Sequence, residues 1–181
     1  MACLKSLTSY SKGCKKVSGG VSKLWMIAYS DLQYLTGTVS NFKVDATGNM
    51  VSEIGLKTGK KFVEVGLIKN TFGVVENYAS TPEANSFELT TEITLVVSDI
   101  SIDSRTFVNN LLEASEVACI IQLRSGKYIA VGLSGYNEVS AIAGGTGVAG
   151  ADLNGYTITI SGLDNELIRL VDPTILTTVL G

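Results

Sequence analysis

The chain has 181 residues, of which 45% are hydrophobic and 17% charged, and its net charge is −3. This length predicts one domain, residues 1–181, with a substantial buried core. The acidic balance and the lack of a long basic run argue against a nucleic-acid-binding surface of the usual cationic kind. Because the sequence contains no histidine, Ser-His-Asp and Cys-His catalysis are excluded.

Uncharged polar residues take the place of charge on the predicted surface. About a quarter of the residues in an average soluble domain are charged, so a chain with 17% must expose neutral polar faces. Such faces suit a protein that packs against copies of itself, because buried charge is costly and neutral polar groups are easier to satisfy. The longest apolar runs are far short of a membrane span, so we expect no membrane partner.

The chain begins with a predicted N-terminal arm, residues 1–22, which holds two of the three cysteines, Cys3 and Cys14. An odd number of cysteines gives no disulfide framework, and whether Cys3 and Cys14 pair with each other stays open. Residues 23–29 are the first strand candidate. Glycine and asparagine at the centre of residues 42–54 predict a hairpin there.

After a further strand candidate at residues 61–69, residues 70–85 form the longest stretch without a clear period. A loop of this length in a compact domain is usually functional or ordered by a partner. The sequence therefore predicts a long partner-ordered loop that contains Phe72, Tyr78 and Pro82.

Residues 87–97 predict a long strand, because apolar and polar side chains alternate along them. The expected dry face holds Phe87, Leu89, Ile93, Leu95 and Val97, and the wet face holds Glu88, Thr90, Glu92 and Thr94. Glu88 and Glu92 would lie about 13 Å apart, too far for the paired carboxylates of a glycosidase. We interpret these two residues as part of a solvated strand face or of an acidic pore lining.

One helix is predicted over residues 103–114, where apolar pairs recur every four residues and Asp103 or Ser104 supplies the N-cap. A hairpin follows over residues 118–131, with Cys119 as a small buried side chain. The predicted fold is mainly β: a single-domain β-sandwich or barrel with one flanking α-helix, lying on a sheet.

The segment AIAGGTGVAGADLNGYTITISG, residues 141–162, is either a phosphate-binding loop or a structural turn. A phosphate-binding loop needs a lysine and then Ser or Thr after its last glycine, followed by a helix. Here Gly147 precedes Val-Ala-Gly, and a strand follows. We therefore predict a Gly-rich loop over residues 143–153, containing Gly144 and Gly145, and expect no cofactor, no metal ion, no catalytic residue and no enzymatic activity.

Two motifs carry a resemblance to a known group of proteins. The pattern Cys3…Gly13-Cys14…Gly19-Gly20-Val21…Leu24-Trp25 resembles the starts of virion structural proteins from tailed phages of Bacteroidetes-type hosts. The same group's near-C-terminal signature resembles the segment Gly144-Gly145-Thr146-Gly147…Asp152-Leu153-Asn154-Gly155-Tyr156-Thr157-Ile158-Thr159. A β-rich domain of this size with one helix is also similar to the tail-tube superfamily, which includes phage tail tubes and the inner tubes of contractile injection systems.

The resemblance implies a subunit that closes into homohexameric rings, whose sheets join into one barrel and whose rings stack into a hollow tube for DNA. It further implies a place in the virion tail after assembly in the host cytoplasm, contacts with other tail or neck proteins, and transient contact with DNA in the lumen. Candidate lumen residues are then Glu88 and Glu92, and candidate inter-subunit loop residues are Phe72, Tyr78, Pro82, Gly144, Gly145 and Gly147.

Two other interpretations stay open. A tail-terminator or head-tail joining protein would share the fold but form a single ring. A carbohydrate-binding β-sandwich would present exposed aromatic side chains, for which Phe72, Tyr78 and Tyr136 are the candidates. An enzyme that works without histidine is the least favoured class.

Overall fold

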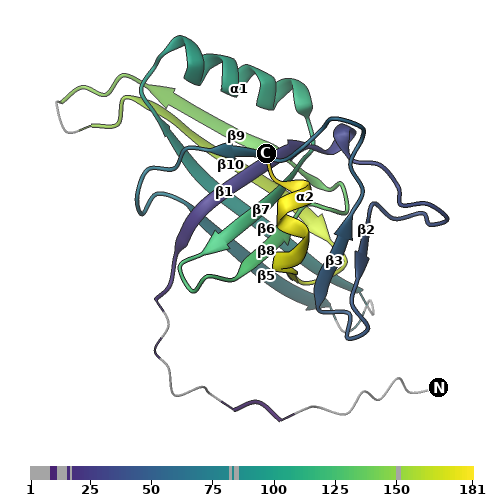
Figure 1. Cartoon of the computed structure of the whole chain (residues 1–181). Coiled ribbons are helices and arrows are strands. Elements are labelled where there is room, and N and C mark those ends of the chain that lie inside the picture. The colour runs from purple at the N-terminus through teal and green to yellow at the C-terminus, as the bar shows by residue number, and fades with distance from the viewer. Residues whose placement is uncertain (1–8, 12–15, 17, 82, 84–85, 150–151) are drawn as a thin grey trace.

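Two β-sheets face each other, and a helix lies along one side of them (Figure 1). The structure is a computed structural model that describes residues 9–11, 16, 18–81, 83, 86–149 and 152–181. The seven-stranded sheet has the order β2 (Phe42–Val44), β3 (Met50–Ile54), β11 (Arg169–Val171), β8 (Tyr128–Val131), β7 (Val117–Leu123), β1 (Val21–Ala28) and β4 (Val63–Val65). The four-stranded sheet has the order β5 (Gly73–Thr81), β6 (Ser86–Ser98), β10 (Gly155–Asp164) and β9 (Asn137–Gly145).

The main hydrophobic core lies between the two sheets. Leu24 and Met26 of β1 belong to one buried cluster with Leu95 of β6 and Ile158 of β10. Cys119 of β7 is fully buried in the same cluster, and the loss of water around it raises the pKa of its thiol to about 12. This thiol stays protonated at neutral pH and acts as an apolar packing group.

A second core lies on the opposite face of the seven-stranded sheet. Trp25 and Ile27 of β1, together with Ala118 and Ile120 of β7, point into it, so these central strands are buried on both faces. The C-terminal segment, with the 3₁₀ turn η3 (Pro173–Ile175) and the short helix α2 (Leu176–Val179), contributes side chains to this second core. Because both faces of these strands are buried, apolar side chains occupy consecutive positions in the middle of β1 and along most of β7.

Helix α1 (Ile102–Ala114) lies beside the four-stranded sheet and buries Val108 and Leu111 in the main core. Ser101 caps the helix, because its hydroxyl oxygen accepts from the Ser104 backbone amide at 3.2 Å while the Ser104 hydroxyl oxygen accepts from the Ser101 amide at 2.9 Å. The helix therefore starts one residue before the predicted start, and its N-cap is Ser101 instead of Asp103 or Ser104. In the described part of the chain, none of the helices has the length and apolar character needed to cross a bilayer.

The predicted fold class is confirmed: two packed sheets with a flanking helix at the expected place. The predicted hairpins at residues 42–54 and 118–131 are β2–β3 and β7–β8. A second, four-residue helix, α2, and the 3₁₀ turn η1 (Tyr29–Asp31) were not predicted from the sequence.

Several boundaries were predicted wrongly, among them the strand candidate at residues 61–69, which is a strand only over Val63–Val65. The predicted loop at residues 70–85 is mostly strand β5, because residues 73–81 pair with β6 along their whole length. The predicted arm of residues 1–22 runs two residues too far, since β1 begins at Val21. The predicted Gly-rich loop of residues 143–153 starts three residues too early, because β9 continues to Gly145 by pairing with β10.

Replacement of Leu95 tests the main core. Leu95 is 0% exposed between the sheets, so Leu95→Ala is expected to lower the free energy of unfolding by about 2–5 kcal/mol through lost burial and an internal cavity. Val75→Ala is the control, because Val75 is 52% exposed on the outer side of the four-stranded sheet. Its effect in a urea titration is expected to stay within about 0.5 kcal/mol. Equal losses in the two variants would contradict the described packing.

Candidate assembly surface

The outer face of the four-stranded sheet is uncovered by any described part of the chain. The strand register places one set of alternating side chains toward the core and the other set outward. None of the outward-facing side chains is buried. The outward set, called the outer face below, comprises Val75, Asn77, Ala79, Glu88, Thr90, Glu92, Thr94, Val96, Glu138, Ala141, Ala143, Thr157, Thr159, Ser161 and Leu163.

All the charge on the outer face is negative. Glu88 and Glu92 lie on β6 as the alternation predicted, and both are exposed. The register adds Glu138 of β9, opposite Ser161 of β10. None of the four strands contains a lysine or an arginine. The outer face is therefore a neutral Thr, Ser, Ala and Val surface with acidic groups and no cation to attract a polyanion.

Both edges of the four-stranded sheet are long and largely unpaired within the described chain. The edge strand β5 pairs only with β6, whereas the edge strand β9 pairs with β10 and, at Glu138 alone, forms an isolated bridge with Glu116. Each edge strand has nine residues and no lysine or proline to discourage further pairing. Such edges present free backbone N–H and C=O groups that pair readily with another strand.

The β5–β6 hairpin ends in an exposed aromatic pair. Tyr78 of β5 and Phe87 of β6 stack with ring centroids 5.9 Å apart and an interplanar angle of 25°. Tyr78 is 66% exposed and Phe87 is 52% exposed. The expectation that Phe87 belongs to the dry core face was wrong, because β6 runs on past the core and leaves this side chain outside it. Pro82, predicted in the same segment, lies outside the described residues.

The predicted glycines fall into two environments at the end of the β9–β10 hairpin. Gly144 lies under the ring of Tyr156, where a Cβ would come within 2.7 Å of the ring, whereas Gly145 faces open space. Gly147 has a φ of 69° in the turn beyond them. The backbone amides of Ala149 and Val148 both donate to the Asp152 carboxylate at 2.8 Å and lower the pKa of Asp152.

The predicted loop aromatics are not brought together. Phe72 is half-buried against the main core at the start of β5, whereas Tyr78 is exposed near the end of the same strand. Tyr136, which is 56% exposed, lies outside the β5–β6 hairpin, in the connection between β8 and β9. The three aromatic candidates for sugar binding therefore do not form one platform.

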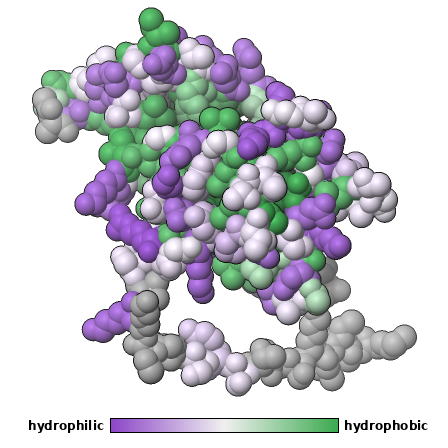
Figure 2. Space-filling model, in the orientation of Figure 1, coloured by the Kyte–Doolittle hydropathy of each residue, from purple (hydrophilic) through white to green (hydrophobic). Residues whose placement is uncertain are grey.

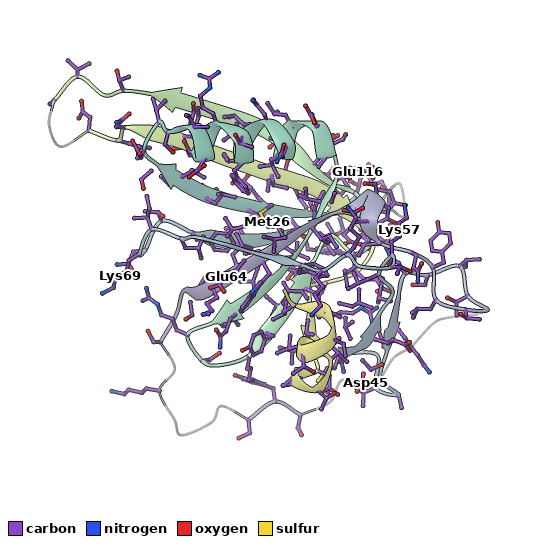
Figure 3. The ribbon with its side chains drawn as sticks, turned by 45° about the horizontal axis from the view of Figure 1, so that its top comes forward. Met26, Asp45, Lys57, Glu64, Lys69 and Glu116 are labelled. Carbon is purple, nitrogen blue, oxygen red and sulfur yellow. The ribbon has the colours of Figure 1, made fainter. Side chains whose placement is uncertain are left out.

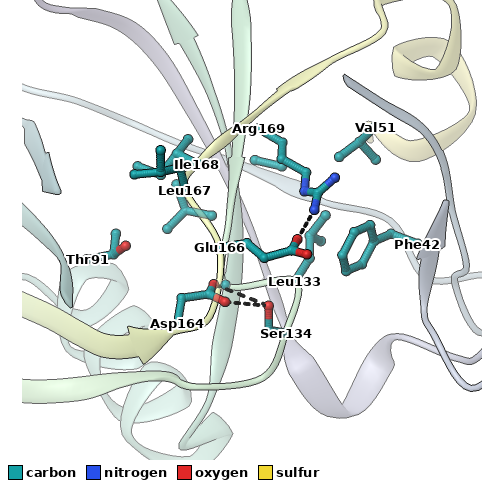
Figure 4. A pocket seen from close by; sticks show the side chains of 13 residues that line it. Phe42, Val51, Thr91, Leu133, Ser134, Asp164, Glu166, Leu167, Ile168 and Arg169 are labelled. Carbon is teal, nitrogen blue, oxygen red and sulfur yellow. Dashed lines mark hydrogen bonds and ion pairs between the residues drawn. The ribbon is translucent and has the colours of Figure 1, made fainter. Parts of the chain in front are cut away.

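The charged cavity near β11 is too small for a substrate (Figure 4). Its volume is about 30 Å³, the space of about one water molecule. The Ser134 hydroxyl donates to both oxygens of the Asp164 carboxylate, at 3.0 and 3.2 Å, and Glu166 forms an ion pair with Arg169. Each of these charged groups has a hydrogen-bond or ion-pair partner within the cluster, as expected for side chains with a structural role. Within the ranges described, no three His, Cys, Asp or Glu side chains are grouped to hold a metal ion.

Comparisons with protein-family models, with curated proteins and with solved structures gave no significant match. The case for an assembly surface therefore comes from the geometry of the four-stranded sheet alone.

Sequence reasoning found Glu88 and Glu92 but missed two parts of the surface. Glu138 joins the acidic face only through the β9–β10 register, which passes an irregularity between Thr159 and Ile160. The Tyr78–Phe87 pair depends on the β5–β6 register, and β5 was taken for a loop. Weak alternation in residues 74–78, with Val74, Glu76 and Tyr78 on one face, was the available signal for β5.

Two neighbouring glycines of β9 give a matched test of the hairpin. Gly144→Ala forces a Cβ against the Tyr156 ring, so we expect a loss of about 1–3 kcal/mol in the free energy of unfolding. Gly145→Ala places its Cβ in open space and is expected to be neutral or slightly stabilising. Urea denaturation of both variants measures the difference. A neutral Gly144→Ala would mean that Tyr156 does not lie over this glycine.

Proposed function

We propose that the chain is the structural subunit of a hollow phage tail tube, in which six copies close into a ring and rings stack to conduct DNA. The observation that carries this proposal is the four-stranded sheet, with one uncovered acidic face and two nine-residue edges that are free apart from the Glu116–Glu138 bridge on β9. The subunit then works in the virion tail, after assembly in the host cytoplasm, in contact with other tail or neck proteins.

Ring closure follows from the two free edges. When β9 of one copy pairs with β5 of the next, the sheets of successive copies join into a single barrel. Closure removes the edges that a monomer exposes, and backbone hydrogen bonds supply the contact without any charged pair. The low charge of the chain, 17%, favours this burial because few ionised groups lose their water.

The outer face then becomes the lining of the barrel. Glu88, Glu92 and Glu138 of each copy face the DNA, and none of the lining strands contributes a cation. DNA binding to proteins gains most of its affinity from lysine and arginine contacts to phosphates. A lining that lacks such contacts lets DNA slide without being held.

A tail-terminator or head-tail joining ring is the second candidate. It would use the same free edges for closure but would not stack. Stacking therefore decides between the two functions.

Electron microscopy of the purified wild-type protein at high concentration tests the proposal. We expect long hollow filaments. Isolated rings would favour the terminator, and a protein that stays monomeric by sedimentation at every concentration would overturn the proposal.

The lining role of the acidic residues is tested by the double variant Glu88→Lys/Glu92→Lys. We expect its tubes to retain nucleic acid, measured as a raised ratio of absorbance at 260 nm to that at 280 nm in purified tubes. The control is Glu53→Lys/Glu113→Lys, which makes the same change of charge at exposed residues of β3 and α1. Equal retention in both variants would show that total charge alone, and not the outer face, is responsible.

A further inference from the structure

The two ends of the four-stranded sheet differ in charge and shape. Strand β5 connects them: its first residue, Gly73, follows Phe72, and its last, Thr81, lies at the free end of the β5–β6 hairpin. From Phe72 to Ser80 an extended strand covers about 26 Å. In Figure 1 the β4–β5 connection and the free end of the β5–β6 hairpin lie on opposite sides of the molecule.

The end beside Phe72 is basic and hollow. A cavity of about 600 Å³ is lined by residues that include Lys69, Arg124, Phe72, Val21 and Leu67, and none of its lining residues is acidic. The Arg124 guanidinium donates to the Asn70 side-chain oxygen, which holds it at the rim. Figure 3 shows Lys69 projecting at this side of the molecule, and Figure 2 shows hydrophilic side chains gathered there. Val21, Leu67 and Phe72 are partly buried against the main core, so they give this mainly polar cavity an apolar part of its wall.

The opposite end is acidic and projects. The β5–β6 hairpin presents the exposed Tyr78–Phe87 pair, with Glu83 near its tip and Glu88 beside Phe87. The sequence contains no lysine or arginine from residue 70 to residue 104. The aromatic rings stay exposed because β6 extends beyond the strands that cover its inner face.

We infer that Tyr78, Phe87 and Glu83 of the β5–β6 hairpin of one copy dock at the Lys69–Arg124 cavity of the next copy, so that copies join head to tail. The inference rests on the proposed function, since it names the contact that stacks the rings. The exposed aromatic pair contacts apolar side chains of the cavity wall, and Glu83 lies against the basic groups Lys69 and Arg124. The cavity volume falls within the usual range for sites that enclose a group of this size.

The directionality of this contact explains how a stack of copies can grow without a fixed end. A contact between two different surfaces of the same molecule leaves one free surface of each kind after every addition. Such a contact adds copies without limit along its axis, whereas a symmetric contact would stop at a pair. Closure through β5 and β9 and growth through the hairpin end then use different parts of the same sheet.

Cysteine cross-linking tests the contact directly. Ser86 lies beside Phe87 and Ser125 beside Arg124, and both serines are exposed. In chains that also carry Cys3→Ser and Cys14→Ser, we expect a short bis-maleimide to join Ser86→Cys in one population to Ser125→Cys in a differently tagged population. Cys119 is buried and does not compete. Products linked 86 to 86 or 125 to 125, or no product at a concentration where filaments form, would overturn the inference.

Charge reversal gives a second readout with a matched control. Glu83→Lys and Arg124→Glu are each expected to raise the protein concentration needed for half-maximal stacking by about fivefold, the effect of one exposed ion pair. The double variant is expected to recover. Glu113→Lys makes the same change of charge at an exposed residue of α1, outside both proposed contacts, and is expected to leave stacking unchanged. No recovery in the double variant, or an equal effect of Glu113→Lys, would count against the docking.

The same samples separate the two proposals. Hollow tubes without the mixed cross-link would leave the tail-tube function standing and remove the hairpin contact. The mixed cross-link in solid fibres without a lumen would support the contact and remove the tube.

Discussion

Burial of one face of the four-stranded sheet against the seven-stranded sheet is the constraint on which the rest of the molecule depends. Because side chains alternate along a strand, fixing Leu95 and Ile158 in the core also fixes which side chains point outward. A shift of one residue in the register would bury Glu92 and expose Ile93. The acidic outer face is therefore held in place by the hydrophobic core behind it.

The two sheets differ in how far other parts of the chain cover them. The central strands of the seven-stranded sheet are buried on both faces, and its outer side is closed by the C-terminal turn and helix. The four-stranded sheet keeps one face open, and its two edges are open apart from the Glu116–Glu138 bridge. Helix α1 closes the side between the two sheets, and in the proposed assembly the four-stranded sheet is the part left available to neighbouring copies.

Local patterns predicted the parts of the fold that depend on neighbouring residues. The period of two along residues 89–95, the glycine turn near Gly48 and the four-residue repeat in α1 each report local geometry, and all three are present. Strand β5 was missed because only Val74 and Tyr78 are apolar on its inner face, with Glu76 between them, and because its partner strand supplies most of the pairing. The side of the sheet that carries Glu138 and the meeting of Tyr78 with Phe87 depend on register between segments, which no short pattern encodes.

The place of β11 in the larger sheet has a consequence for synthesis on the ribosome. This strand, residues 169–171, is inserted between β3 and β8, and it pairs in parallel with β3. A nascent chain that still lacks these residues cannot complete the seven-stranded sheet, although β5, β6, β9 and β10 all precede β11 in the sequence. The edge strands of the smaller sheet are thus synthesised before the larger sheet that supports them is complete, and in that interval they can pair with another nascent copy.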